Sequence, residues 1–372
     1  MDRLVHLDLK GAPPSMKSSF WNEFCTWLVE KGRVTGLLIE FEDVLPIKLL
    51  EDLDSALPRK RRHVYSPQEA HILISVAQAR GLKIIPLVQT FGHLEYLLKY
   101  NQLKSLREHP DYPDSICPAE TSESPSFSIV TQLIDQTMTF LRDFCHAGVD
   151  AIHLGGDEVW QLGQGSRSRE RLLAGETRLD LYIRHIELIT NHNKTKYPGM
   201  RTLLWDDMLR TISPAEQQRI SPLLRDSLEL VVWQYSPNPA EHLPQDLFSR
   251  YSSNFNRPPW AATAFKGASS SCALLPDIAN RISNHIGWTN ISNQNRFTGV
   301  VLTGWQRFDH YASLCELMPV SIPSLRCCLA ALDSPDIRHC PQGMIGILFN
   351  VNIFSHLIVP IDNFLDQASL NY

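Results

Sequence analysis

Two adjacent carboxylates, Asp157 and Glu158, follow two glycines in the segment HLGGDEVWQLG, directly after a short apolar run. Two acids that share a pocket repel each other, which raises the pKa of at least one of them. A glutamic acid that stays protonated near neutral pH can donate a proton to a leaving oxygen. Gly155 and Gly156 permit a tight turn, so both acids can reach the same space. The pair indicates acid–base chemistry; the alternative is an ordinary solvated turn.

Four tryptophans, at positions 160, 205, 233 and 305, lie at or near the ends of predicted strands. Flat indole rings pack against the apolar faces of sugars, whose hydroxyls then bind carboxylates and amides. An acid beside an aromatic pocket is typical of glycoside hydrolysis. Any one of these tryptophans could instead be core packing, so the interpretation depends on their common location.

Apolar, β-branched segments alternate with helical patterns along the chain. Strands buried on both faces and separated by helices predict a parallel sheet. Eight such strands predict an α/β fold, a (β/α)8 TIM barrel in a single catalytic domain. A doubly wound sheet is the alternative, but it requires a glycine-rich phosphate loop after the first strand, and LKGAPP is not one. The predicted strands are Leu4–Leu9, Gly36–Phe41, Lys83–Val88, Ala151–Leu154, Thr202–Trp205, Leu230–Trp233, Trp260–Phe265 and Gly299–Thr303, and the predicted helices are 18–31, 66–80, 126–146, 178–196, 276–288 and 310–317.

Polar and aromatic residues collect at the carboxyl ends of the predicted strands. In a TIM barrel these ends open on one face, where enzymes of this fold hold their active sites. A protein with only a structural role has no reason to place such a residue after nearly every strand. The group comprises Asp8, Lys10, Glu40, Glu42, Asp43, Gln89, Thr90, His93, Asp157, Glu158, Trp205, Asp206, Asp207, Trp233, Tyr235, Lys266, Trp305, Gln306, Arg307 and Asp309.

The composition excludes several function classes. The net charge of −5 is small and mixed in sign, and the basic run at 59–62 is short, so nucleic acid is not an expected partner. The eight cysteines form no C-x-x-C pair, which argues against zinc knuckles and redox chemistry. A metal-dependent hydrolase would need histidines such as His6, His93 and His153, but these form neither H-x-H nor H-E-x-x-H. We expect no metal and no cofactor.

The two ends of the chain suggest where the protein works. The first residues, MDRLVHLDLKG, are charged, unlike a secretory signal, and reduced cysteines fit a cytoplasmic and nuclear location. The segment 344–361 is apolar, but two asparagines, a serine, a histidine and a proline interrupt it. A membrane span is therefore not expected; packing against the barrel and local disorder are the alternatives.

The segment HLGGDEVW resembles the H-x-G-G-D-E signature of family-20 glycoside hydrolases, the β-N-acetylhexosaminidases. Further segments in the same order are similar to the nucleocytoplasmic branch of that family: LVHLDLKGAPP, GLLIEFED, IPLVQTFGH, LLWDDML, AFKGA and LTGWQRFDHY. The resemblance implies a (β/α)8 catalytic domain over residues 1–332. It does not extend to residues 333–372, which form an atypical C-terminal tail.

This resemblance implies an exo-β-N-acetylhexosaminidase that removes terminal N-acetylgalactosamine or N-acetylglucosamine with retention. The 2-acetamido oxygen of the substrate attacks, which is the exception to the usual two-carboxylate rule. Glu158 would be the general acid and then the base. Asp157 would accept a hydrogen bond from the acetamido N–H and stabilise the cationic, oxazolinium-like intermediate.

The same resemblance suggests which residues bind the sugar. Three tryptophans match the family's aromatic walls, and Tyr235, with Tyr311 as the alternative, is the candidate for binding the acetamido oxygen. His93 matches a supporting histidine in a P-G-H phrase, although a purely structural histidine is equally compatible. Asp206 and Asp207 could bind hydroxyls or hold the acid. The predicted substrate-binding residues are Trp205, Trp233, Trp305, Tyr235, Asp207, Asp8, Lys10, His93, Gln306 and Asp309.

The sequence departs from the wider family at two points. An arginine near the end of the first strand is absent, and Lys10, together with Asp8, would take its place at the sugar hydroxyls. The usual W-x-E phrase is replaced by Trp305, Gln306 and Arg307. Recognition of the 4- and 6-hydroxyls is therefore open, although similarity to the nucleocytoplasmic branch favours the galacto sugar.

Two function classes remain. The first is the active hydrolase, and the second is a catalytically weak or inactive sugar-binding TIM barrel. In both cases the expected partner is a small glycoside or glycoconjugate that ends in N-acetylhexosamine. Neither nucleic acid nor a membrane is expected, and a homodimer is a further hypothesis.

Overall fold

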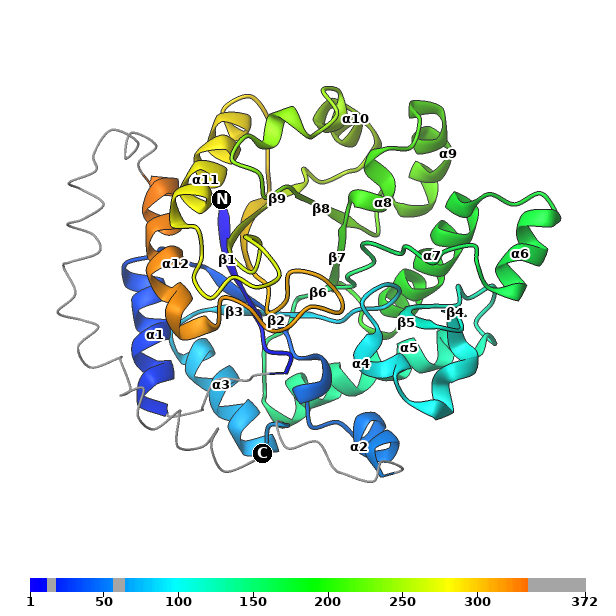
Figure 1. Cartoon of the computed structure of the whole chain (residues 1–372), viewed down its shortest axis with the longest axis horizontal. Coiled ribbons are helices and arrows are strands. Elements are labelled where there is room, and N and C mark those ends of the chain that lie inside the picture. The colour runs from blue at the N-terminus through cyan, green and yellow to red at the C-terminus, as the bar shows by residue number, and fades with distance from the viewer. Residues whose placement is uncertain (12–17, 56–63, 334–372) are drawn as a thin grey trace.

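A computed structural model of the chain describes residues 1–11, 18–55 and 64–333. Eight parallel strands close a barrel in the order β1-β10-β9-β8-β7-β6-β3-β2 (Figure 1). The TIM-barrel prediction is confirmed, and every predicted strand is found within two residues of its expected bounds. The doubly wound alternative is wrong, because β1 and β10 pair directly, with Asp2 opposite Gly299. The strands are β1 Asp2–Asp8, β2 Gly36–Glu40, β3 Lys83–Leu87, β6 Ala151–His153, β7 Arg201–Trp205, β8 Glu229–Trp233, β9 Trp260–Lys266 and β10 Gly299–Gly304.

The interior of the barrel changes from apolar to polar toward the carboxyl ends of the strands. Leu4 and Leu38 belong to a buried apolar cluster in which Trp205 and Trp260 are the largest side chains. Because side chains alternate along a strand, the next inward positions after Leu4 and Leu38 are His6 and Glu40, both fully buried. The sequence thus places its polar inward residues at the end of the barrel where a site can open.

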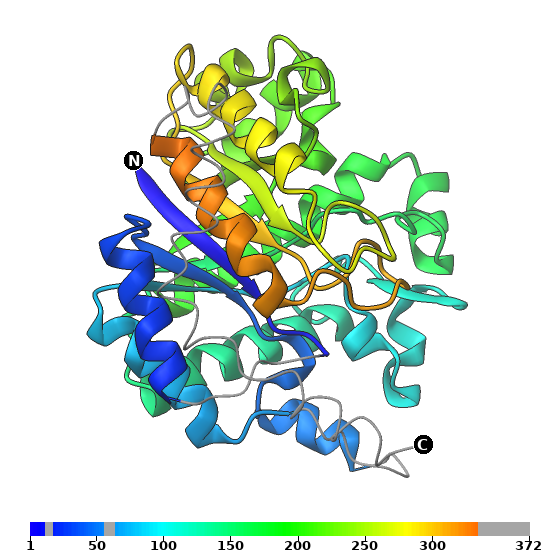
Figure 2. The same cartoon turned by 60° about the vertical axis from the view of Figure 1, so that its left-hand side comes forward.

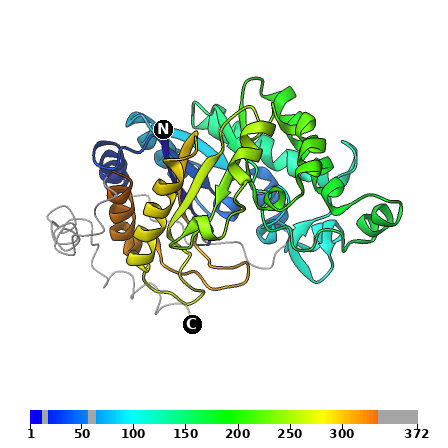
Figure 3. The same ribbon diagram turned by 90° about the horizontal axis from the view of Figure 1, so that it is seen from above.

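Helices cover the outside of the barrel. Three of them begin at a capping box, in which a serine or threonine side chain and an acid three residues later satisfy each other's backbone N–H groups. Figure 3 shows α1, α12 and α11 side by side on one flank. The main helices are α1 Ser18–Glu30, α3 Pro67–Ala79, α5 Pro125–Thr139 with a π-helical end η3 Phe140–Phe144, α7 Arg178–Lys196, α11 Ile278–Ser292 and α12 Met318–Asp333. Shorter ones are η1 Glu42–Val44, α2 Lys48–Asp54, α4 Glu95–Leu98, η2 Asn101–Leu106, α6 Ser166–Leu173, α8 Asp207–Arg210, α9 Pro214–Leu224, η4 Pro239–Glu241 and α10 Leu247–Asn254.

One helix prediction is wrong. Residues 310–317 form turns, and the helix begins only at Met318. The carboxylate of Asp309 accepts the backbone N–H groups of Tyr311 (3.0 Å) and Ala312 (2.8 Å), and Arg307 pairs with Leu314 in an isolated bridge. These local hydrogen bonds compete with a helix and hold the loop in place over the barrel mouth.

A two-stranded hairpin was not predicted from the sequence. Its strands, β4 Arg107–His109 and β5 Tyr112–Ile116, lie in the long connection between β3 and α5 (Figure 1). Buried Glu108 accepts the N–H of Gly163 (2.8 Å), and the carbonyl of Asp114 accepts the N–H of Leu94 (2.9 Å). The hairpin therefore braces two of the loops that surround the mouth.

The last described helix closes the barrel next to its beginning. In Figure 2, α12 lies beside β1 and α1, and Arg3 forms an ion pair of 2.7 Å with Asp333. No helix in residues 1–11, 18–55 and 64–333 is both long and apolar enough to cross a membrane. The basic run at 59–62 and the apolar segment 344–361 lie outside the described residues.

Candidate active site

A cavity of about 820 Å³ opens at the carboxyl ends of the strands, large enough for a sugar and part of its leaving group. It brings together eight of the twelve predicted site residues. Those that line it are Lys10, His93, Asp157, Glu158, Trp233, Tyr235, Trp305 and Asp309, whereas Asp8, Trp205, Asp207 and Gln306 do not.

The turn after β6 delivers both acids to this cavity, as the sequence predicts. Gly155 has a φ of +63°, and a Cβ atom there would collide with Gln89. A Cβ atom on Gly92 would lie 2.3 Å from the carbonyl oxygen of Asp157, so the two loops pack backbone to backbone. Glu158 itself has a φ of +48°, a strained conformation for a residue with a side chain. Strain of this kind persists only where the surroundings hold the residue in place.

His93 bridges the two acids. Its Nε2 atom lies 3.3 Å from the Asp157 carboxylate and 3.5 Å from that of Glu158. Burial alone would lower the pKa of His93, but the Asp157 charge and the hydrogen bonds to both acids raise it to about 10. Burial would raise the pKa of Asp157, but the charge of His93 holds it below its usual value. At neutral pH the pair is therefore an ion pair, and Asp157 is ionised, as its predicted role requires.

Asp207 supports Glu158 and does not line the cavity. Its carboxylate accepts the backbone N–H of Glu158 (3.0 Å) and the indole N–H of Trp233 (3.3 Å). Burial, together with the nearby charge of Asp157, raises the pKa of Asp207 to about 7. Of the two roles that the sequence left open for this residue, the contacts favour support of Glu158.

Asp206 points away from the cavity and is fully buried. It pairs with Arg210 and accepts the hydroxyl of Tyr251 (3.0 Å). Arg210 in turn lies over the ring of Trp233, with its guanidinium carbon 4.9 Å from the ring centroid. This buried pair anchors α8, and through it the wall of the cavity.

Replacing Arg210 by methionine is expected to lower the free energy of unfolding by about 3–5 kcal/mol, because it leaves Asp206 buried without its cation. Urea unfolding measures the change. The matched control is Arg219→Met, which removes an exposed ion pair with Asp180 and should cost less than about 1 kcal/mol. Equal losses in the two variants would contradict the structural role given to the Asp206–Arg210 pair.

Aromatic side chains form one wall of the cavity. Trp233 and Tyr235 stack with their centroids 5.4 Å apart, and the Trp305 indole N–H donates to the Tyr235 hydroxyl (3.0 Å). The Tyr235 hydroxyl also forms a hydrogen bond with the Thr303 side chain, and Tyr235 lines the cavity. Trp205 lies beneath this wall, fully buried and 5.8 Å from Trp305, and does not face the cavity. Tyr311 lies outside the cavity lining, and its hydroxyl donates to Asp114 (3.3 Å).

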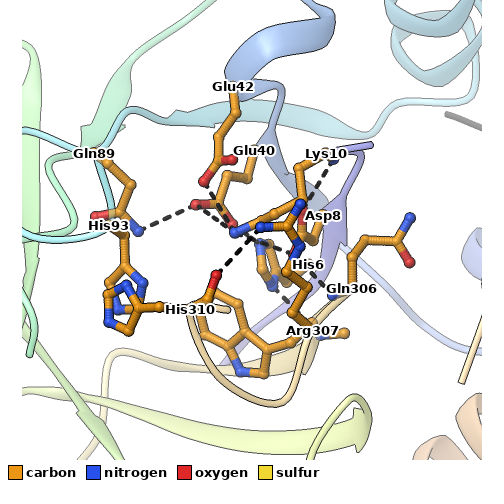
Figure 4. Close-up of polar contacts among 12 residues, drawn as sticks. His6, Asp8, Lys10, Glu40, Glu42, Gln89, His93, Gln306, Arg307 and His310 are labelled. Carbon is orange, nitrogen blue, oxygen red and sulfur yellow. Dashed lines mark hydrogen bonds and ion pairs between the residues drawn. The ribbon is translucent and has the colours of Figure 1, made fainter. Parts of the chain in front are cut away.

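Lys10 is surrounded by acids at the opposite side (Figure 4). Its Nζ atom lies 2.9 Å from Glu42, 3.6 Å from Asp8 and 3.9 Å from Glu40. Burial alone would lower the pKa of Lys10, but these acids raise it well above its usual value. Lys10 and Glu42 both line the cavity and can offer a donor and an acceptor to a ligand.

Asp8 and Gln306 form a hydrogen bond with each other close to Lys10 and do not line the cavity. The Asp8 carboxylate accepts the backbone N–H of Gln306 (2.8 Å) and that of Lys10 (3.1 Å). The Gln306 side chain accepts a hydrogen bond from buried Lys266 (3.2 Å). These contacts tie the β10–α12 loop to β1 and β9.

Glu95 and His310 are among the residues of the mouth that sequence reasoning missed. His310 stacks on His93, and its Nδ1 atom contacts the Glu95 carboxylate. The letters GHLE carry a partial signal, because they place an acid two residues after the candidate histidine. Nothing in the sequence indicates that a histidine 215 positions away along the chain completes the group.

Ligand atoms of His93, Glu95 and His310 lie within 4.8 Å of one another, a spacing found in metal sites. The two imidazole planes, however, are only 3° from parallel, with centroids 4.0 Å apart. The lone pairs of an imidazole lie in its ring plane, so they do not converge on a tetrahedral ion in this arrangement. His6 and His153, the other histidines considered for a metal, are buried in the barrel and do not line the cavity.

Comparisons with known proteins agree with this site. Residues 39–243 match the family model described as "Glycosyl hydrolase family 20, catalytic domain". Hexosaminidase D of Bos taurus is 38% identical over 338 residues, covering 89% of this chain and 91% of the relative. Hexosaminidase D of Homo sapiens is 35% identical, covering 93% and 69%.

Solved structures support the fold. A β-N-acetylhexosaminidase from Bacteroides fragilis aligns with a TM-score of 0.59 at 15% identity, over 93% of this chain and 71% of that one. An exo-β-N-acetylglucosaminidase from Vibrio harveyi, in complex with N-acetylglucosamine, aligns with a TM-score of 0.61 at 15% identity, over 93% and 57%. At such identities these likenesses show a shared fold, whereas the two mammalian relatives and the matched domain establish kinship. The chain belongs to glycosyl hydrolase family 20.

Proposed function

We propose that the protein is an exo-β-N-acetylhexosaminidase that acts by substrate-assisted, retaining hydrolysis. The observation that carries the proposal is the pairing of an ionised Asp157, held by His93, with Glu158 in one cavity. The Asp157 carboxylate does not readily take up a proton, so it can stabilise a cationic intermediate. The neighbouring Glu158 can transfer a proton. The names of the mammalian relatives, both hexosaminidases, support the same class.

In the first step the acetamido oxygen of the substrate attacks the anomeric carbon as the glycosidic C–O bond breaks. Glu158 gives its proton to the leaving oxygen, and the positive charge spreads over the oxazolinium ring. Asp157 accepts a hydrogen bond from the ring N–H and offsets its charge. In the second step Glu158, now a carboxylate, removes a proton from water, which attacks the anomeric carbon. The bond between that carbon and the acetamido oxygen breaks, and the sugar leaves with its configuration retained.

The wall of the cavity would orient the attacking group. The O–H of Tyr235 would turn from Thr303 to donate to the acetamido oxygen, and the faces of Trp233 and Trp305 would enclose the acetyl methyl and the sugar ring. Lys10 and Glu42 would bind hydroxyls at the opposite side. We propose the galacto sugar as the preferred substrate, and comparison of the two epimers tests this point.

The test is release of nitrophenol from p-nitrophenyl N-acetyl-β-galactosaminide and its gluco epimer by the full chain. Turnover on at least one of them is expected. Saturable binding of N-acetylhexosamine without any release would instead favour the sugar-binding barrel and contradict the proposed hydrolase.

Trp160 is expected to bind the leaving group. It lines the cavity, yet 64% of its surface is exposed, and its backbone N–H donates to the carbonyl of Glu158 (2.7 Å), which holds the backbone of Trp160 close to the acid. Trp160→Ala should raise KM about 5- to 10-fold for a disaccharide, through lost stacking on the second ring. A methyl glycoside, whose leaving group is too small to reach the indole, should be hydrolysed with nearly unchanged KM.

The matched control is Phe144→Ala, which removes an exposed aromatic ring from the outer layer of helices and should leave both KM values unchanged. If Trp160→Ala raised KM for the methyl glycoside as much as for the disaccharide, the assignment of Trp160 to the leaving-group side would be wrong.

A further inference from the structure

We propose that His310, held by Glu95, is a positioning residue that directs the proton of Glu158 toward the leaving oxygen. The inference rests on the proposed function, because it assigns a partner to the acid of that same site. His310 lies on the β10–α12 loop, Glu95 begins α4, and Glu158 follows β6, so the group joins three separate parts of the barrel mouth.

The contacts form a short chain. The Nδ1 atom of His310 contacts the Glu95 carboxylate, and its Nε2 atom lies 3.9 Å from the carboxylate of Glu158. The His310 ring stacks flat on that of His93, with centroids 4.0 Å apart, and Figure 4 shows the two rings one over the other. The Nε2 atom is buried and has no hydrogen-bond partner among the described residues. A buried polar atom without a partner, next to the acid, calls for an explanation.

Glu95 decides which nitrogen of His310 carries the proton. A carboxylate accepts hydrogen bonds only, so the contact with Glu95 places the proton on Nδ1. Burial, with the nearby charges of His93 and Lys10, lowers the pKa of His310 to about 3, so the ring is neutral. Its Nε2 atom is then a lone-pair acceptor that faces Glu158. Such an acceptor interacts favourably with a protonated carboxyl and unfavourably with a carboxylate.

The two stacked histidines would therefore serve opposite halves of the reaction. Protonated His93 favours Glu158 as a carboxylate, which is the form that activates water. Neutral His310 favours Glu158 as an acid, which is the form that cleaves the bond. Because Glu158 has to alternate between both forms, a balanced pair of neighbours explains why two histidines lie at this position.

The test is Glu95→Gln, which keeps the size of the side chain but can donate an amide N–H to Nδ1. The ring proton of His310 then moves to Nε2. The Nε2 atom, which faces Glu158, can no longer accept a hydrogen bond from the Glu158 carboxyl. We expect kcat on phenyl N-acetyl-β-galactosaminide, which has a poor leaving group, to fall about tenfold or more. The 2,4-dinitrophenyl glycoside has a leaving group that departs without being protonated, so its kcat should change less than about twofold. The alkaline limb of the phenyl kcat profile should move to lower pH.

Two further variants separate this effect from a folding defect. His310→Phe keeps a flat ring on His93 but removes the acceptor, and it should show the same dependence on leaving group. Asp135→Asn makes the same carboxylate-to-amide change at an aspartate–histidine pair between outer helices, where Asp135 and His192 lie 2.9 Å apart. This variant should keep parental rates.

The possible outcomes are distinct. A loss in Glu95→Gln that is equal for the two leaving groups would mean a merely structural contact, and parental rates on both would equally overturn the inference. A parent chain that hydrolyses neither glycoside contradicts the proposed function itself, and the inference then falls with it.

Discussion

Glu158→Gln is expected to lower kcat on phenyl N-acetyl-β-galactosaminide by about 10²–10⁴-fold. The amide keeps the shape of the side chain and can still lie beside His93, but it has no proton to give to the leaving oxygen and cannot activate water. Binding should survive, because Asp157, Tyr235 and the tryptophans are unchanged. The dissociation constant of a thiazoline that mimics the oxazolinium intermediate, measured by calorimetry, should stay within about tenfold of the parental value.

The loss should be smaller for a 2,4-dinitrophenyl glycoside, whose departure needs no acid, although release of the sugar still requires a base. Added azide, which attacks without a base, should then restore part of the turnover. Near-parental turnover of the phenyl glycoside by Glu158→Gln would remove this residue from the mechanism.

Asp157→Asn is expected to have the second largest effect. The carboxylate stabilises the cationic intermediate, and its removal also leaves His93, with a pKa raised to about 10, without its main counter-charge. Losing one such electrostatic contact in a dry site costs about 10²–10³ in kcat. The phenyl and the dinitrophenyl glycosides should be affected alike, because the same oxazolinium ion forms as either leaving group departs.

Asp277→Asn is the matched control for this variant. Asp277 also lines the cavity, but it caps α11 by accepting the N–H of Asn280 (3.1 Å), and asparagine caps helices equally well. Its turnover should be near that of the parent. If Asp157→Asn worked at the parental rate, attack by the acetamido group would not be the route.

The barrel was accessible from sequence because its strands are short apolar runs buried on both faces, which helices and turns separate clearly. The errors occurred where local hydrogen bonds prevail. Asp309 stabilises turns in a stretch with helical spacing, and the hairpin strand Arg107–His109 is too short to produce a recognisable alternation. Both errors fall in the loops that surround the cavity, where sequence patterns constrain the backbone least.

The acid pair was also accessible, because two carboxylates after a glycine turn are conspicuous. Which way a strand-end side chain points was not. Trp205 and Asp8 sit on the inward-facing register of their strands, yet the tryptophan fills the barrel and the aspartate holds a loop. Contacts across the chain, such as that of Glu95 with His310, depend on the packing of separate loops, and one sequence carries no trace of them.

The central claim is that the substrate's own acetamido oxygen attacks while Asp157 and Glu158 assist. The most direct measurement compares kcat/KM of the full chain on p-nitrophenyl 2-acetamido- and 2-trifluoroacetamido-β-galactosides, since fluorine withdraws electrons from the attacking oxygen. The account predicts a fall on the order of a hundredfold or more. Equal rates on the two substrates would contradict it, because they would assign the attack to another nucleophile.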